Sequence, residues 1–144
     1  MSDTALNPGS GDTRPLPGRP LRILLADDDR DATLSLSTLL KLEGYEVRYV
    51  YDGGATLDAV REFEPDVVLI DIGMPKLSGY DVARYIREHC GKERPVLVAL
   101  TGWKQASDKI LATLAGFHHH VAKPYDPSAL LELIRKLERR ESPA

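Results

Sequence analysis

The sequence has little of what marks a secreted, membrane-spanning or zinc-bound protein. Its 144 residues hold one cysteine, Cys90, which cannot form an internal disulfide and is too few for a zinc cage. No apolar run approaches the roughly 18 residues of a membrane span. The first residues, Met1 to Thr4, also lack the basic and then apolar pattern of a signal peptide. These absences predict a cytoplasmic protein with no membrane partner.

Positive and negative charges are nearly balanced. The chain has 19 Lys and Arg against 22 Asp and Glu, a formal net charge of −3, which argues against direct binding of nucleic acid through bulk positive charge. The 42% hydrophobic and 28% charged residues are typical of a folded globular protein and exclude a wholly disordered chain. The distribution is less even, because three acids stand side by side at Asp27, Asp28 and Asp29.

Composition divides the chain into an arm, a domain and a tail. Residues 1–20 contain Pro and Gly at seven positions, few apolar residues and no periodicity, so we predict a disordered N-terminal arm. Residues 21–140 then form one domain of about 120 residues, an ordinary domain size. Residues 141–144 are left as a short C-terminal tail.

Short apolar runs alternate with amphipathic segments along this domain. Strands are expected at 21–26, 46–50, 67–70, 96–100 and 117–122. Helices are expected at 30–43, 55–63, 79–89, 107–115 and from 127 to about 140. Gly44 and Gly116 stand where two of these helices should end, and Asp126 is a good N-cap for the last.

The alternation predicts an α/β fold with a doubly wound (βα)5 parallel sheet covered on both faces. The unbroken apolar runs VVLI and VLVAL fit strands buried on both sides. Right-handed crossovers leave few topologies. The strand order 2-1-3-4-5 fits best, because it places the least apolar strand, EVRYV, at an edge.

Special polar residues stand where four of the strands end. Asp27 and Asp28 follow the first strand and Asp71 the third, while Thr101 and Lys123 follow the fourth and fifth. Parallel strands end at one edge, so we expect these side chains to meet there. Neighbouring carboxylates repel one another unless a proton or a cation intervenes. A hard divalent ion with oxygen ligands, most simply Mg²⁺, would resolve this repulsion.

Four segments together carry a family resemblance. ILLADDD, VVLIDIGMP, VLVALTG and VAKPY, in this order, resemble the receiver domain of bacterial two-component response regulators. The resemblance extends over residues 21–140 and implies a flavodoxin-like, CheY-like fold. Each motif alone is weak, whereas the four in order are specific.

The resemblance implies a phosphoacceptor and a metal site. Asp71 would take a phosphoryl group from a phosphohistidine on a histidine kinase or a histidine phosphotransfer protein. Mg²⁺ would be held by Asp28, by Asp71 and by the backbone carbonyl of Gly73, with Asp27 acting through water. The protein would then be a signalling phosphoacceptor that promotes its own phosphorylation and dephosphorylation, rather than an enzyme with a separate substrate.

The resemblance also implies a conformational switch. Lys123 would pair with a phosphoryl oxygen, aimed inward by a cis peptide bond before Pro124. Thr101 would form a hydrogen bond to the phosphoryl group and change a protein-interaction surface. His120 occupies the place where the family carries a switching aromatic residue, so the output could depend on pH.

The pathway stays open at this stage. Few residues follow the last helix, so we expect a stand-alone regulator that acts on a protein partner, through the face of the helix at 107–115, the strand at 117–122 and the last helix. The alternative is a receiver module of a hybrid histidine kinase, or a phosphorelay intermediate that passes the phosphoryl group onward. A phosphohydrolase would need a second acid two residues after the nucleophile, where Gly73 stands. A phosphorylation-independent scaffold would be expected to lose some of the five key residues, all of which are present.

Two further features have competing interpretations. In His118, His119 and His120, alternation along a strand would turn the middle side chain away from the others, so a single metal site is disfavoured. Trp103 lies two residues beyond Thr101 and either packs in a loop or shields the phosphoryl group from water. Cys90 is expected to be a passive thiol.

Overall fold

The structure, a computed structural model, describes residues 19–74, 76–91, 94–102 and 106–141. The expected N-terminal arm, except its last two residues, and residues 142–144 of the tail lie outside this part. Trp103 lies outside it as well, so its hypothesis stays a prediction.

Five strands alternate with five helices, as the sequence predicts. The strands are β1 (Arg22–Ala26), β2 (Glu46–Val50), β3 (Val67–Asp71), β4 (Val96–Thr101) and β5 (His119–Ala122). The helices are α1 (Arg30–Leu42), α2 (Gly53–Phe63), α3 (Gly79–Cys90), α4 (Ala106–Ala115) and α5 (Pro127–Glu141). In the described ranges no helix is long and apolar enough to cross a membrane.

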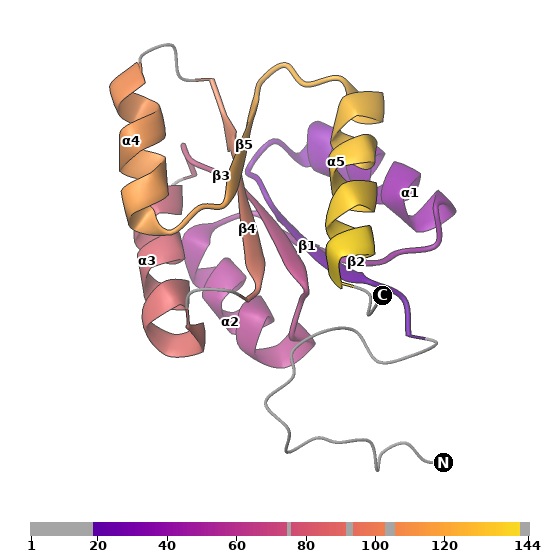
Figure 1. Cartoon of the computed structure of the whole chain (residues 1–144), viewed down its shortest axis with the longest axis horizontal. Coiled ribbons are helices and arrows are strands. Elements are labelled where there is room, and N and C mark those ends of the chain that lie inside the picture. The colour runs from indigo at the N-terminus through magenta and orange to yellow at the C-terminus, as the bar shows by residue number, and fades with distance from the viewer. Residues whose placement is uncertain (1–18, 75, 92–93, 103–105, 142–144) are drawn as a thin grey trace.

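The strands form one parallel sheet in the order β2-β1-β3-β4-β5, which confirms the predicted topology. Helices α1 and α5 cover one face of the sheet, and α2, α3 and α4 cover the other (Figure 1). The register pairs Ala26 with Ile70 and Asp71 with Leu100. The ends of the three central strands therefore lie level with one another.

Alternate residues of the central strands build two separate cores. Leu24 of β1 and Val68 of β3 pack under α2, α3 and α4, whereas Ile23 and Leu69 pack under α1 and α5. Each of these side chains is fully buried, and burial of an aliphatic side chain stabilises the fold by about 1.5–3 kcal/mol. Strand β2 is only partly buried, as expected of an edge strand.

Helix α2 begins two residues earlier than predicted. The sequence pattern predicts a helix from residue 55, but the structure includes Gly53 and Gly54 in it as well. The Asp52 side chain accepts a hydrogen bond from the Ala55 N–H at 2.8 Å, so Asp52 is the N-cap. The cap sets the start of the helix although two glycines follow it.

The predicted start of the fifth strand at Phe117 is wrong by two residues. Gly116 has a φ of 109°, and the Phe117 N–H donates to the Ala112 carbonyl at 3.1 Å. These features are the C-terminal cap of α4. Phe117 is buried in the core as a part of that cap, and the strand begins only at His119.

Candidate functional site at the carboxyl edge of the sheet

Three carboxylates converge at the ends of β1 and β3. Asp27 and Asp28 directly follow β1, and Asp71 is the last residue of β3. One oxygen from each lies within 4.8 Å of the others, and this is the only group of three potential metal-ligating side chains among the residues that the structure describes. Asp27 and Asp71 are buried, whereas Asp28 is exposed. The predicted convergence is confirmed.

Lys123 lies between two of these acids. Its Nζ is 2.9 Å from Asp27 Oδ2 and 3.3 Å from Asp71 Oδ2. The peptide bond between Lys123 and Pro124 is cis, as the resemblance implies. The one ammonium therefore offsets part of the negative charge of three carboxylates.

The electrostatics of the site reflect this crowding. Burial raises the pKa of Asp27, and the nearby Asp71 raises it further, although the Asp29 N–H and Lys123 act in the opposite direction. Burial alone would lower the pKa of Lys123, but the hydrogen bond and charge of Asp27, together with Asp71, raise it overall. Lys123 therefore stays protonated at neutral pH.

Backbone N–H groups fix the second oxygen of both buried acids. The Asp29 N–H donates to Asp27 Oδ1 and the Gly73 N–H donates to Asp71 Oδ1, each at 3.0 Å. Each carboxylate thus accepts from the residue two positions further along, as in an Asx turn. This arrangement leaves the Oδ2 atom of each acid facing Lys123.

Thr101 lies beside the acids, and His120 does not. Thr101 is buried at the end of β4, one residue past Leu100, the partner of Asp71. The Lys123 N–H donates to the Thr101 carbonyl at 2.7 Å, which ties the two positions together. His120 is exposed on β5 in register with Ala99, below the level of Asp71. Its role in a switch stays a prediction.

Asp29 is the N-cap of α1. Its Oδ1 accepts a hydrogen bond from the Ala32 N–H at 3.1 Å. The three consecutive acids after β1 therefore separate into two at the site and one that begins a helix.

Two residues near the site were missed by the sequence analysis. Tyr125 is half-buried two positions after Lys123, and burial together with the charge of Asp27 raises the pKa of its phenol. Lys76 adopts a φ of 72° in the loop after β3, with its Nζ 3.9 Å from Asp52 Oδ2. The signal for Tyr125 was its place directly after the Lys-Pro pair. No signal in the sequence pointed to the pairing of Lys76.

The donor set fits a hard divalent cation. Carboxylate oxygens are the ligands that Mg²⁺ prefers, and Asp27, Asp28 and Asp71 carry more negative charge than Lys123 offsets. A bound cation would relieve the remaining repulsion.

Comparison with known proteins identifies the family. The model of the response regulator receiver domain matches residues 23–135. The chain belongs to this family. The receiver domain is thus a component of two-component signalling, and the resemblance seen in the sequence is confirmed.

Curated relatives of this receiver domain include the response regulator MprA of Mycobacterium sp. strain KMS. It is 39% identical over 124 residues, which are 86% of this chain and 53% of the relative. A second MprA, from Mycobacterium avium strain 104, is 37% identical over 123 residues, 85% of this chain and 53% of the relative. The chain spans about half the length of these relatives.

Solved structures agree with the observed fold. A CheY-like response regulator receiver domain protein from Methanospirillum hungatei JF-1 has a TM-score of 0.77 at 27% identity, over 85% of this chain and 96% of that one. A response regulator receiver domain protein from Clostridium thermocellum has a TM-score of 0.75 at 29% identity, over 84% and 96% of the two chains. The CheY-like, flavodoxin-like architecture is confirmed.

Proposed function

We propose that this receiver domain accepts a phosphoryl group on Asp71 from a phosphohistidine of a histidine kinase or a histidine phosphotransfer protein. The observation that supports this is the placement of Asp71, whose Oδ1 is fixed by the Gly73 N–H while its Oδ2 lies 3.3 Å from Lys123. A carboxylate oxygen of Asp71 attacks phosphorus as the bond from phosphorus to the histidine nitrogen breaks, and that nitrogen keeps the electron pair. Lys123 offsets the charge of the phosphoryl oxygens during this transfer.

The proposed metal is Mg²⁺. Asp28, Asp71 and the backbone carbonyl of Gly73 would hold it, with Asp27 acting through water. When bound, it neutralises charge on the phosphoryl oxygens. The convergence of three carboxylates, two of them paired with Lys123, supports this assignment.

The proposed output is a protein-interaction surface on α4, β5 and α5, changed when Thr101 bonds to the phosphoryl group. Helix α4 exposes Ile110, Leu111 and Leu114, which are 61%, 51% and 77% accessible. Three large apolar side chains on one helix support a surface that a protein partner covers. We propose a cytoplasmic location and a receiver at residues 21–140 for this activity.

The pathway has two candidate arrangements. The stand-alone regulator predicted from the sequence stays a prediction, because the curated relatives are about twice as long as the matched segment. A module of a hybrid kinase, or an intermediate that passes the phosphoryl group onward, is the alternative. Transfer of label from phosphorylated protein to a histidine phosphotransfer protein would favour the second arrangement.

The deciding experiment is incubation with Mg²⁺ and acetyl phosphate, followed by intact mass. We expect the gain of one phosphoryl group, loss of this gain in Asp71→Asn, and normal gain in Asp58→Asn, whose carboxylate lies exposed on α2. Chelation of Mg²⁺ should abolish labelling. Absence of labelling in the folded protein, or sustained turnover of a phosphate monoester, would contradict the proposal.

A further inference from the structure

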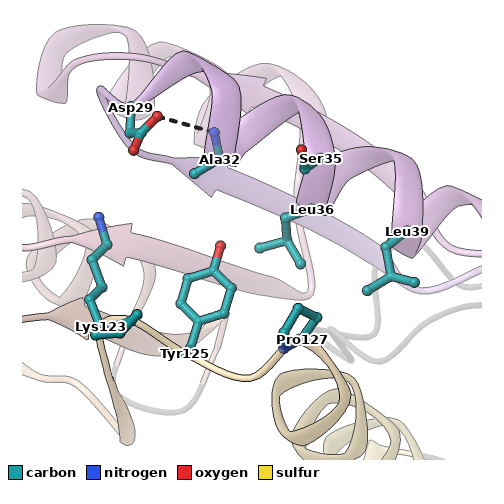
Figure 2. A pocket seen from close by; sticks show the side chains of 9 residues that line it. Asp29, Ala32, Ser35, Leu36, Leu39, Lys123, Tyr125 and Pro127 are labelled. Atoms are coloured by element: carbon teal, nitrogen blue, oxygen red, sulfur yellow. Dashed lines mark hydrogen bonds between the residues drawn. The ribbon is translucent and has the colours of Figure 1, made fainter.

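A cavity of about 490 Å³ lies between α1 and the segment that joins β5 to α5 (Figure 2). Its apolar lining comes from both sides: Ala32, Leu36 and Leu39 of α1, and Pro124 and Pro127 opposite. The volume is within the range of small-molecule sites, roughly 300–1,000 Å³. The cavity can therefore hold a small ligand with an apolar body.

One end of the cavity borders Lys123, which connects it to the proposed phosphoacceptor. Lys123 lines the cavity, and the same ammonium lies 3.3 Å from Asp71 Oδ2. The cavity thus begins one side chain away from the carboxylate that accepts the phosphoryl group. Further in, the apolar side chains of Leu36 and Leu39 extend the cavity along α1 (Figure 2).

The two other polar side chains at this end, Asp29 and Tyr125, do not prevent an anion from binding. The Asp29 carboxylate bonds to the Ala32 N–H, and its charge is offset by the N-terminus of α1. The Tyr125 hydroxyl points toward α1 (Figure 2), and its phenol stays protonated because its pKa is raised by burial. Lys123 is then the charged group available to an incoming anion.

We propose that the cavity receives the apolar tail of a small-molecule phosphodonor, an acyl phosphate with a chain of several carbons. Such a molecule has its anionic phosphoryl group where Lys123 and Asp71 lie and its apolar part where the leucines and prolines lie. The length of α1 from its N-cap Asp29 to Leu39 is about 15 Å, so an extended acyl chain has room along the cavity. This inference rests on the proposed function and names a substrate class for it.

The transfer balances without a further reactant. An oxygen of Asp71 forms a bond to phosphorus, and the bond from phosphorus to the acyl oxygen breaks. The electron pair leaves on that oxygen, so the products are the aspartyl phosphate and the free carboxylate. No proton or electron has to be supplied.

The test compares donors on the full chain with Mg²⁺, using intact mass to obtain second-order rate constants. Hexanoyl phosphate should react about tenfold or more faster than acetyl phosphate, because each methylene group removed from water contributes up to about fourfold. Phosphoramidate, which has no acyl chain, serves as the reference donor. Equal rate constants for the hexanoyl and acetyl donors would overturn the proposal and leave the cavity to an apolar side chain of a protein partner.

A matched pair of variants locates the effect. Ser35 is exposed on α1 and lines the cavity, so Ser35→Phe should fill it, whereas Ser35→Ala should leave it open. We expect Ser35→Phe to lower the ratio of hexanoyl to phosphoramidate rate constants about tenfold and Ser35→Ala to preserve it. An unchanged ratio in Ser35→Phe would contradict the proposal.

A binding measurement separates this inference from the proposed function. Hexanoate, the product carboxylate, should bind the unphosphorylated protein in a calorimetric or NMR titration, and Ser35→Phe should weaken that binding. If no donor labels Asp71, the proposed function fails while hexanoate binding still decides whether the cavity takes an acyl chain. If hexanoate does not bind, or if Ser35→Phe does not weaken its binding, the inference is overturned even if Asp71 is labelled.

Discussion

Asp27 and Asp71 illustrate how a fold holds charges that repel each other. Each uses one oxygen to accept a backbone N–H and presents the other to Lys123. Asp28 adds a third carboxylate within 4.8 Å of these two, while Lys123 pairs with Asp27 and Asp71. We expect this crowding of negative charge to destabilise the fold when no cation is bound.

Asp27→Asn should therefore stabilise the protein in metal-free buffer. Asparagine keeps the acceptor for the Asp29 N–H and removes a buried charge, so we expect the free energy of unfolding at pH 7 to rise by about 1 kcal/mol. Because the pKa of Asp27 is raised in the folded state, native wild type takes up a proton as pH falls, and the gain should shrink at acid pH. Urea unfolding between pH 4 and 7 measures both effects.

The control for that variant is Glu88→Gln, at an exposed position on α3. It should leave the free energy of unfolding unchanged at each pH. Added Mg²⁺ should stabilise wild type more than Asp27→Asn. A loss of stability in metal-free Asp27→Asn would contradict the interpretation.

Asp66 is a buried charged residue that stabilises the fold at the edge of the sheet opposite Asp71. Its Oδ2 accepts the Arg22 N–H at 2.8 Å, and its Oδ1 lies 3.3 Å from Arg19 and 3.7 Å from Arg94. Asp66→Ala leaves these donors without their acceptor and should cost about 3 kcal/mol of unfolding free energy, measured by urea unfolding. Labelling of Asp71 in the folded fraction should persist, since Asp71 lies at the other edge of the sheet.

Glu62→Ala is the matched control for Asp66→Ala. Its carboxylate pairs with Arg48 on the surface, where ion pairs contribute about 0–1 kcal/mol. An equal loss of stability in both variants would show that burial of Asp66 is not the reason for its effect.

At the scale of elements, the start of α3 lies against the end of β3. A Cβ atom on Gly79 would lie 2.8 Å from the Ile72 Cα and 3.0 Å from the Asp71 carbonyl oxygen. These are backbone atoms that cannot move alone, so Gly79→Ala should cost about 2 kcal/mol and slow the labelling of Asp71. Gly54→Ala, whose nearest contact is the Asp52 side chain at 3.5 Å, should be neutral or stabilising in thermal unfolding.

A hydrogen bond joins the loop between α1 and β2 to α5. The Tyr45 hydroxyl lies 3.0 Å from Glu138 Oε1, and burial with the charge of Glu138 raises the pKa of Tyr45 to about 12. Tyr45→Phe should cost about 1 kcal/mol at pH 8. The raised pKa means that this contribution is present below pH 10 and is lost as pH rises toward 12, so wild type and variant should converge in alkaline urea unfolding. Tyr85→Phe, on α3, should behave as wild type.

The bounds of the strands and helices could be predicted where the pattern of apolar residues sets them. They could not be predicted where a helix cap sets them. The runs VVLI and VLVAL became β3 and β4 because only a doubly covered strand buries such residues. Phe117 is also apolar and buried, but its N–H bonds to α4 rather than to the sheet. Asp52 likewise sets the start of α2 through its hydrogen bond from the Ala55 N–H, although the glycines that follow it disfavour a helix.

At the scale of the whole molecule, the strand order is what made most of the site predictable. Once the order 2-1-3-4-5 is deduced, the residues that end β1, β3 and β4 must meet, and Asp27, Asp71 and Thr101 do. The contact of Lys123 with two acids and the cavity beside it follow from side-chain packing between distant segments. No local pattern in the sequence reports that packing.

Phosphorylation should change the dynamics of elements far from Asp71. If Thr101 moves toward the phosphoryl group, amide hydrogen exchange should change in α4 and β5, and β2 at the other edge should be unaffected. Mass spectrometry of wild type with Mg²⁺ and acetyl phosphate, against Asp71→Asn treated alike, measures this difference. Identical exchange in the two proteins would contradict a switch at α4, β5 and α5.

The single cysteine offers a practical consequence. Cys90 is exposed at the last turn of α3, and the first residue of the same helix touches the backbone beside Asp71. The two residues stand at opposite ends of this 12-residue helix, about 16 Å apart along its axis. A thiol-reactive dye would attach to these 144 residues at one place, away from the three acids yet on a helix that packs beside them. The protein thus carries its own attachment point for an optical reporter of phosphorylation.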